Sequence, residues 1–298
     1  MNKKNKIIAL VKIWPVKIAV LFLIAAILFL NSFYLFNHKE EHPQKPIPSD
    51  YNAKNLVKPT DIPEKPASLS AQLKIPIVMY HYVEYVQDKG DHTRLSLDTT
   101  PYTFESELKS LINEGYQTYF VKDIPKILEG KIKYDLSKAV VLTFDDGYED
   151  FYLNAFPLIK EYHVKATLFP IYDFINKQGF LTDTEIREII ASGLVEIGSH
   201  TLDHVGLKHV SSQVAQKQIV DSKKDLEQEF GIKVESFAYP FGAFNNNVME
   251  MVKQASYSAA VSVIPGSIQS ENNLFYLSRI RAGFFSYNIA GVLSALKK

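Results

Sequence analysis

The amino-acid sequence of 298 residues contains no cysteine and no excess of charge of either sign. The absence of cysteine excludes disulfide bonds, thiolate zinc sites and a cysteine nucleophile. Lysine plus arginine and aspartate plus glutamate both number 33, so the formal net charge is zero. A nucleic-acid-binding domain usually carries a basic surface, and the neutral balance therefore gives no support to a nucleic-acid partner. Glycine is also scarce, at 13 residues, and the 46% of hydrophobic residues is ordinary for a globular protein.

A long apolar run lies near the N-terminus. Residues 18–30 are all apolar, and the run FYLF extends the segment to Phe36. A helix of about 20 apolar residues spans a bilayer, so 18–36 is predicted to be a transmembrane anchor. The five lysines in residues 1–17 predict a cytoplasmic basic N-terminus and an extracellular C-terminal part. A cleaved signal peptide is the alternative, but no A-x-A-like cleavage site follows Leu30.

Residues 37–74 differ in composition from the rest of the chain. They contain six prolines with charged residues between them, which is typical of an extended, semi-rigid spacer. We therefore predict a proline-rich extracellular spacer over 37–74, followed by one domain over 75–298.

Within residues 75–298, short apolar runs alternate with helical patterns. The run IPIVMYHYV at 75–83 is typical of a strand, and in the next pattern Phe104, Leu108 and Leu111 fall on one helical face. Such alternation predicts an α/β fold with a mostly parallel sheet covered by helices. About seven strands in one domain favour a closed or nearly closed (β/α) barrel, and a doubly wound open sheet is the alternative.

Polar groups follow four of the predicted strands. They are His81, Asp145 with Asp146, His200 with His204, and the segment YPFG at 239–242. In parallel barrels the reactive side chains gather where the strands end. We therefore expect these groups to lie together at one rim of the barrel.

The stretch SHTLDH places His200 and His204 four residues apart. On a helical turn this spacing puts both imidazoles on one face, where they can converge on one ion. A chance match among 8 histidines is the alternative. Two histidines with one carboxylate from a neighbouring strand leave positions open for water and substrate, which is typical of a catalytic divalent metal site.

The adjacent Asp145 and Asp146 follow the apolar run AVVLTF. Two neighbouring carboxylates repel each other, and a cation would relieve that repulsion. One of them can bind the ion while the other takes a proton from the attacking water. The alternative is an Asp-Asp-Gly turn that only closes the strand.

The motifs TFDDGY, SHTLDH and AYPFG, in this order, resemble the successive motifs of the polysaccharide deacetylase family, the NodB-homology domain. The resemblance implies a distorted (β/α) barrel that removes N- or O-acetyl groups from polysaccharides with one divalent metal ion, zinc first and cobalt or nickel as alternatives. It also implies a role for each matching residue: Asp145 as general base, Asp146, His200 and His204 as metal ligands, and Tyr239 as the source of a backbone N–H for the developing oxyanion.

Two positions depart from the family pattern. Ala238 stands where the third motif usually has an arginine that orients the base, and Arg279 and Arg281 are the candidates to replace it. The family usually supplies its general acid from a C-terminal histidine, but none follows His209. His81 is then the expected acid, as in the branch that resembles the poly-β-1,6-N-acetylglucosamine deacetylases of biofilm exopolysaccharide. A packed strand residue is the alternative for His81.

Three aromatic residues near the motifs, Tyr148, Tyr239 and Phe241, are placed to line a sugar-binding groove. Flat aromatic rings stack on pyranose faces, although core packing explains the same residues equally well.

These features together predict a membrane-tethered, extracellular, metal-dependent hydrolase of amide bonds. The expected substrate is poly-β-1,6-N-acetylglucosamine, with β-1,4-linked peptidoglycan or chitin-type chains as the alternative. A non-catalytic carbohydrate-binding module of the same fold is an alternative of another class. The expected partners are the polysaccharide and, through the anchor, the membrane. Secretion or cell-wall association after signal cleavage is the alternative location.

Overall fold

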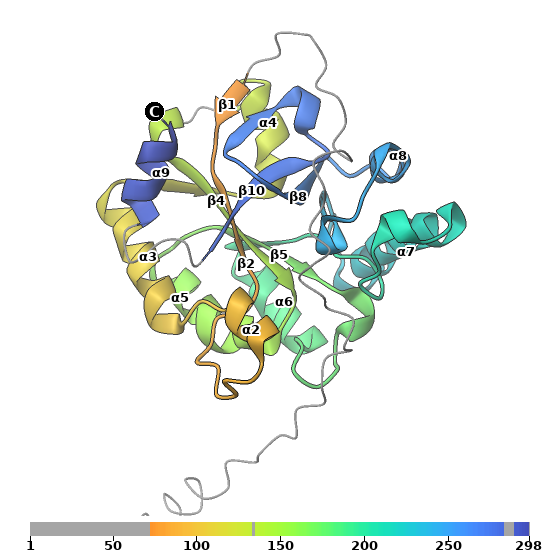
Figure 1. The fold of residues 1–298 in the computed structure, drawn as a ribbon, viewed down its shortest axis with the longest axis horizontal. Coiled ribbons are helices and arrows are strands. Elements are labelled where there is room, and N and C mark those ends of the chain that lie inside the picture. Colours follow the sequence, from red (N-terminus) through yellow and green to blue (C-terminus); the bar gives the residue numbers. More distant parts are fainter. Residues whose placement is uncertain (1–71, 133–134, 283–288, 298) are drawn as a thin grey trace, which may run out of the picture. The chain divides into compact units, whose positions relative to one another are not determined.

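Seven parallel β-strands form a barrel in this computed structural model, which describes residues 72–132, 135–282 and 289–297 (Figure 1). Along the sheet they follow the order β6-β5-β4-β2-β10-β8-β7. Their bounds are β2 (Ile77–Tyr80), β4 (Ala139–Asp146), β5 (Ala166–Pro170), β6 (Val195–Ile197), β7 (Ser236–Ala238), β8 (Ala259–Pro265) and β10 (Leu277–Arg281).

The two ends of the sheet meet just beyond β6. Ser199 donates its N–H to Ser236 O at 3.0 Å, and Ala238 donates its N–H to Ser199 O at 2.9 Å. This parallel bridge pairs Ser199 with Phe237 of β7 and closes the barrel at one point. The predicted distorted barrel of about seven strands is confirmed, and the open doubly wound sheet is wrong.

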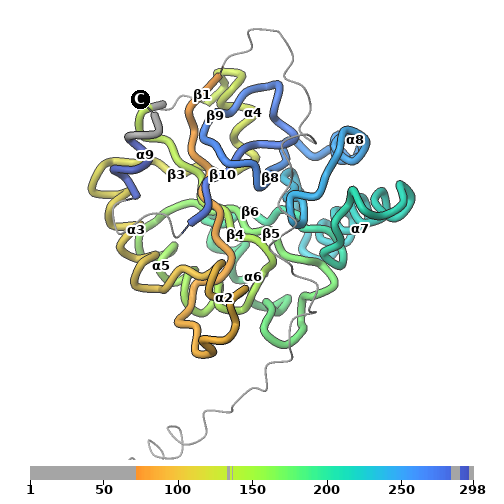
Figure 2. The backbone as a smooth tube through the Cα atoms, viewed as in Figure 1, coloured from red at the N-terminus to blue at the C-terminus, as the bar shows by residue number. Residues whose placement is uncertain are grey.

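The helices lie around the outside of the strands (Figures 1 and 2). A short antiparallel pair, β1 with β9, lies apart from the barrel sheet, and β3 pairs with the start of β4. The bounds are β1 (Gln72–Lys74), β3 (Gln117–Tyr119), β9 (Ile268–Ser270), α2 (His92–Leu97), α3 (Pro101–Asn113), α4 (Ile124–Leu128), α5 (Phe156–Glu161), α6 (Asp183–Ala191), α7 (Ser212–Phe230), α8 (Asn246–Gln254) and α9 (Ile289–Lys297).

The residues at the helix ends explain where α6 starts and where α7 stops. Thr182 and Glu185 form a capping box at the start of α6. Gly231, with φ of 66°, ends α7 in the left-handed conformation that glycine adopts at little cost.

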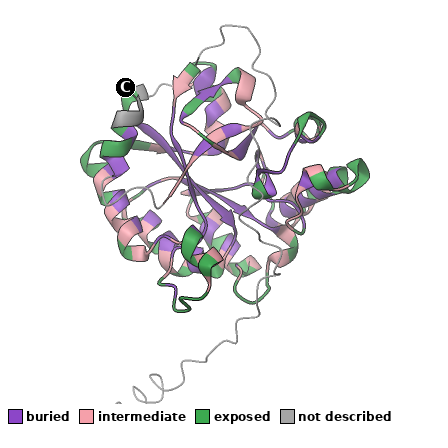
Figure 3. Ribbon diagram, in the orientation of Figure 1, coloured by how far each residue is buried: buried purple, intermediate pink, exposed green. Residues whose placement is uncertain are grey.

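Strand β4 separates two hydrophobic layers, and all eight of its residues are buried (Figure 3). Val141 packs with Ile77 and Leu277 of other strands in the cluster that fills the barrel, whereas Leu142 packs in the cluster between the sheet and the helices. Successive side chains of a strand point to opposite faces. Asp145 is in phase with Val141 and is therefore directed into the barrel, at the end where the strand stops.

No helix among the described residues is long and apolar enough to cross a bilayer. The predicted basic N-terminus (1–17), the transmembrane segment (18–36) and residues 37–71 of the spacer lie outside the described residues, so these assignments stay predictions.

Glu107 of α3 is a carboxyl group buried between the sheet and the helices. Its side chain is 0% exposed, and Oε2 accepts a hydrogen bond from the Tyr80 hydroxyl at 2.7 Å. Burial removes hydration from the ionised form and raises the pKa of Glu107 to about 7, and the hydrogen bond from Tyr80 opposes only part of this shift.

The raised pKa of Glu107 predicts that folding stability falls as pH rises. Between its ordinary pKa and about 7 the unfolded chain releases this proton while the folded chain retains it. Above that range the buried charge lowers the free energy of unfolding by up to about 3 kcal/mol. Glu107→Gln should therefore resist urea better than the wild type at about pH 8 and equally at about pH 4.

The matched control is Glu114→Gln, an exposed position that follows the same helix. Its urea midpoint should track that of the wild type at both pH values. Equal midpoints for Glu107→Gln and wild type at the higher pH would contradict the raised pKa.

Candidate metal centre and catalytic site

The end of β4 delivers Asp145 and Asp146 in different directions. Asp146 has φ of 74° and Gly147 has φ of 77°, so the chain turns sharply directly after Asp145. A side chain at Gly147 would meet Pro170 of β5, since a Cβ there would lie 2.9 Å from the Pro170 Cα. Only glycine fits this position. The turn directs Asp146 away from Asp145 and toward the end of β6.

Asp146, His200 and His204 form a cluster at this end of the barrel. Asp146 Oδ1 lies 3.3 Å from His200 Nε2 and 3.2 Å from His204 Nε2. One ligand atom from each of the three residues lies within 4.8 Å of the other two. The structure therefore brings together the three residues that the sequence predicts as metal ligands.

The predicted helical turn between the two histidines is wrong. The segment after His200 is an irregular loop in which Thr201 and His204 have φ of 70° and 64°. Gln218 of α7 holds the loop, because its Oε1 accepts the N–H groups of Leu202 and Asp203 at 3.0 and 3.2 Å. The two imidazoles converge because α7 and the left-handed backbone fold the loop back, and the helical spacing plays no part.

Hydrogen bonding prepares His200 to bind a cation. Its Nδ1 donates to Ala238 O at 2.9 Å, which leaves the Nε2 lone pair directed toward Asp146. Although burial opposes it, the neighbouring imidazoles of His204 and His200, in their protonated forms, hold the pKa of Asp146 well below its ordinary value. Asp146 is therefore an ionised carboxylate in the folded protein.

Asp146 Oδ1 is buried and accepts no hydrogen bond in the described structure. An unsatisfied buried carboxylate oxygen that faces two imidazole nitrogens is costly, and a cation between them removes that cost. Two histidines and one carboxylate are donors that suit a divalent transition metal. The residues therefore fit one divalent ion, which Asp146, His200 and His204 would hold.

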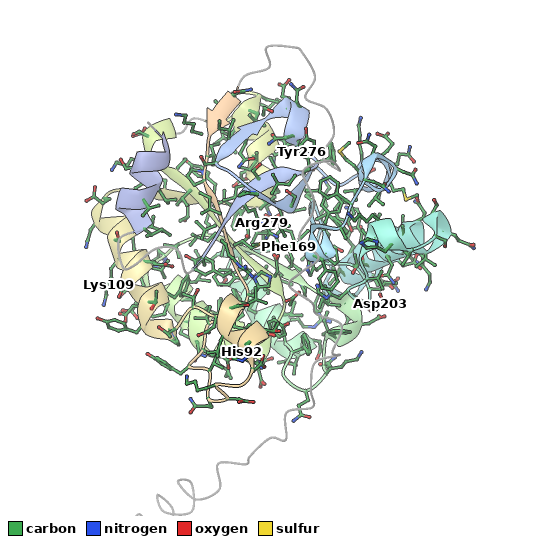
Figure 4. All side chains as sticks on the ribbon, viewed as in Figure 1. His92, Lys109, Phe169, Asp203, Tyr276 and Arg279 are labelled. Carbon is green, nitrogen blue, oxygen red and sulfur yellow. The ribbon has the colours of Figure 1, made fainter. Side chains whose placement is uncertain are left out.

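Asp145 is held by Arg279 of β10. Figure 4 shows Arg279 near the centre of the barrel. The guanidinium donates from Nη1 to Asp145 Oδ1 at 2.8 Å and from Nη2 to Oδ2 at 2.7 Å. Arg279 is only 1% exposed, and it also donates from Nε to Ser262 O at 2.7 Å and from Nη1 to the Thr143 hydroxyl at 3.1 Å. Although burial opposes it, this ion pair lowers the pKa of Asp145.

Of the two arginines predicted to orient the base, Arg279 is the one that is hydrogen-bonded to Asp145 in the described structure. Arg281 lies two residues further along β10, and its buried Nε has no hydrogen-bond partner there. Of the two predicted candidates, Arg279 is therefore the arginine whose guanidinium lies against Asp145.

His81 follows β2 and lies beside Asp145. In the parallel pairing of β2 with β4, Tyr80 is opposite Phe144, so the next residues of both strands are level. His81 Nε2 lies 4.0 Å from Asp145 Oδ2, and the residue is 9% exposed. Burial lowers the pKa of His81, and the nearby Asp145 opposes the shift.

The aromatic predictions have different outcomes. Tyr148 is at the site: its ring stacks on Tyr82 with centroids 4.0 Å apart, and burial and the nearby charge of Asp146 raise the pKa of its hydroxyl. Phe241 is 38% exposed, with its ring centroid 4.4 Å from that of His204. Tyr82 was not predicted, although its place after the first strand, next to His81, was the available signal.

Tyr239 does not have the predicted position. It is 0% exposed, and its hydroxyl donates to Phe275 O at 2.8 Å in the core. Its backbone N–H donates to Val261 O of β8 at 3.3 Å. Because both polar groups are directed into the fold, Tyr239 lines no groove and offers no N–H to an oxyanion.

Comparison with known proteins identifies the family. A family model described as polysaccharide deacetylase matches residues 133–260. YxkH of Bacillus subtilis (strain 168), a presumed polysaccharide deacetylase, is 31% identical over 249 residues, which cover 82% of this chain and 86% of that protein. This chain belongs to the polysaccharide deacetylase family. It is a polysaccharide N-deacetylase, a hydrolase of carbon–nitrogen bonds. The alternative prediction of a non-catalytic carbohydrate-binding module is therefore wrong.

Three further proteins show more distant similarity. The poly-β-1,6-N-acetyl-D-glucosamine N-deacetylase of Staphylococcus aureus (strain N315) is 27% identical over 190 residues, which cover 59% of this chain and 65% of that protein. The structure of the Streptococcus pyogenes deacetylase PplD in complex with acetate has a TM-score of 0.68 at 27% identity and covers 77% of this chain. IcaB from Ammonifex degensii, at 22% identity and a TM-score of 0.65, shares the fold.

Removal of one ligand should abolish metal binding. Asp146→Ala deletes the carboxylate between the two histidines, so zinc affinity should fall by at least about 100-fold, more than the loss of an outer-shell partner costs. Titration calorimetry with zinc on metal-free protein measures the change. Asp203→Asn is the matched control, because Asp203 lies between the histidines in sequence but is exposed, and it should bind zinc as the wild type does. Full zinc affinity in Asp146→Ala would exclude this site.

Proposed function

We propose that this enzyme removes N-acetyl groups from the N-acetylglucosamine units of an extracellular polymer, poly-β-1,6-N-acetylglucosamine, with Asp145 as general base and His81 as general acid. The contact that carries the proposal is the 4.0 Å separation between His81 Nε2 and Asp145 Oδ2 beside the candidate metal triad. The name of the Staphylococcus aureus relative supports the β-1,6-linked substrate.

The proposed reaction assigns a proton to each of two residues. When bound, a divalent ion supplies Lewis-acid chemistry at the acetyl carbonyl and at water. Asp145 accepts a proton from the attacking water, whose oxygen forms a bond to the acetyl carbon. The carbon–nitrogen bond then breaks, and the leaving nitrogen takes a proton from His81. The products are acetate and a free amine, which gives the polymer positive charge at neutral pH.

Arg279 fixes the geometry of the base at a cost in basicity. Its two parallel hydrogen bonds hold both oxygens of Asp145, and such bidentate pairs define orientation closely. The same charge lowers the pKa of Asp145, so the carboxylate stays ionised and ready to accept a proton. We propose that Arg279 is the base-orienting residue of this enzyme.

We also propose that the catalytic domain is displayed outside the cell on the anchor 18–36 and the spacer 37–74. The apolar run, the five preceding lysines and the proline-rich composition support this arrangement. A polymer too large to enter the cell requires an enzyme on that side of the membrane.

Loss of the base should stop turnover without loss of the metal site. Asp145→Asn keeps the shape of the side chain and removes its ability to accept a proton, so kcat should fall by about 10²- to 10⁴-fold. Acetate release by the zinc-loaded variant measures turnover, and zinc titration should give the wild-type stoichiometry. Turnover at the wild-type rate in Asp145→Asn would show that another group is the base.

The linkage of the substrate can be tested with defined oligomers. Acetate release should be faster from β-1,6-linked N-acetylglucosamine oligomers than from β-1,4-linked oligomers of equal length. Faster release from the β-1,4-linked series would instead assign the enzyme to peptidoglycan or chitin-type chains. Asp145→Asn serves as the blank for both series.

A further inference from the structure

Val83 lies shortly after the end of β2, and two side chains hold its backbone. One accepts a hydrogen bond from its N–H, and the other donates one to its carbonyl oxygen. The Val83 N–H donates to Asp150 Oδ2 at 2.5 Å, and the Val83 carbonyl accepts from Asn154 Nδ2 at 2.8 Å. Val83 is fully buried, and it follows His81 by two residues. We call Asp150 and Asn154 together the Val83 clamp.

The Val83 clamp binds the chain beyond the point where the hydrogen bonds between β2 and β4 end. The ladder between β2 and β4 ends at the pair Tyr80 with Phe144. Beyond it, backbone and side-chain bonds replace the ladder: Thr99 N–H donates to Tyr82 O at 3.0 Å, and Glu84 N–H donates to Asp98 Oδ1 at 3.2 Å. The position of His81 therefore depends on the bonds that its neighbours make outside the sheet.

The shape of the helix after β4 brings the two side chains of the clamp to one peptide. Residues Phe151–Ala155 form a π-helical turn, in which the Phe156 N–H bonds to Phe151 O five residues earlier. Such turns are rare and occur frequently at functional sites. Asp150 precedes this turn, Asn154 lies within it, and both reach Val83 from the same side.

The clamp and the catalytic carboxylates belong to one short segment. Asp145, Asp146 and Asp150 lie within six residues of chain, and Tyr148 between them stacks on Tyr82. The chain segment that contains Asp145 and Asp146 is therefore hydrogen-bonded to the segment that contains His81.

Asp150 is a poor choice if its only task is to stabilise the fold. It is 8% exposed, and burial raises its pKa to about 7 even though the hydrogen bond from Val83 opposes the shift. Burying a carboxyl group costs free energy that a neutral acceptor would avoid. Strongly shifted pKa values cluster at functional sites, and unlike the buried Glu107, Asp150 binds the chain segment that carries His81.

We propose that Asp150 and Asn154 are positioning residues that set His81 against Asp145 and the leaving nitrogen of the substrate. The inference rests on the proposed role of His81 as general acid. Neither side chain of the clamp takes part in the chemistry. Each acts through the backbone of Val83, and an error of about 1 Å in the position of the acid is enough to cost about 10²-fold in rate.

The test compares two substrates that differ in their need for an acid. An N-acetyl amide releases an amine, which must be protonated as it leaves, whereas an aryl acetate ester releases a phenolate, which leaves without a proton. The variants are Asp150→Ala and Asn154→Ala, each of which breaks one bond of the clamp. Asp150→Asn is the conservative variant, because an amide oxygen still accepts the Val83 N–H.

Tyr152→Phe is the matched control on the same π-helical turn, because its hydroxyl bonds to Glu188, away from Val83. His81→Ala sets the reference for complete loss of the acid. All variants are measured with zinc bound, and zinc titration verifies equal loading.

Asp150→Ala and Asn154→Ala should each lose about 10- to 100-fold in kcat on the amide, with KM and the ester rate within about 3-fold of wild type. Asp150→Asn should retain most of the amide activity, and Tyr152→Phe all of it. Equal losses on amide and ester would show a general structural effect and overturn the inference, as would wild-type amide turnover in both alanine variants.

The behaviour of His81→Ala separates this inference from the function on which it rests. If His81→Ala loses the amide and keeps the ester while the clamp variants do not, the acid stands and the clamp is wrong. If His81→Ala turns over the amide at the wild-type rate, the proposed acid and the clamp are both wrong.

Discussion

The buried ion pair of Arg279 with Asp145 is the interaction on which the rest of the barrel depends. Both charges lie inside the sheet, where removal of either partner leaves the other uncompensated at a cost of about 3–5 kcal/mol. Arg279 is on β10, Asp145 is on β4, and Ser262 and Thr143 accept the remaining guanidinium bonds from β8 and β4. These strands must therefore be assembled in register before either charge is paired, and the same bonds then fix the orientation of the base.

The alternation of short apolar runs with helical patterns allowed the closed barrel to be predicted from the sequence. The spacing of His200 and His204, the carboxylate at the end of a neighbouring strand and the family resemblance allowed the set of three candidate metal ligands to be predicted. The choice between Arg279 and Arg281 could not be made, because two residues with the same parity on a strand face the same side. The error at Tyr239 has another origin: its role followed from the family resemblance, and β7 before it has only three residues, too few for a pattern to show which side is inward. The strands β1 and β9 and the helices α2 and α4 are also too short to show a periodicity.

The loop between His200 and His204 shows a different limit of sequence reasoning. Thr201 and His204 adopt positive φ although neither is glycine, and a β-branched threonine gives no indication of it. The cause lies in tertiary structure, since Gln218 of α7 binds the loop from outside the motif. The roles of His81, Asp145 and the three candidate ligands stay predictions. In the structure, Asp146 lies against His200 and His204, and Asp145 lies against Arg279 and His81.

The single bridge at Ser199 ties the closure of the barrel to the metal centre, because His200 is the next residue. Gly198, the residue before Ser199, is closely packed: a Cβ there would lie 2.4 Å from the ring of Phe169 and 2.9 Å from Ser236 O. The position of His200 and the closure of the barrel therefore depend on the same short backbone segment. By thermodynamic linkage, an ion that binds only the closed arrangement also holds the seam shut. A bound ion would then contribute to the stability of the barrel, and its removal would weaken the closure between β6 and β7 first.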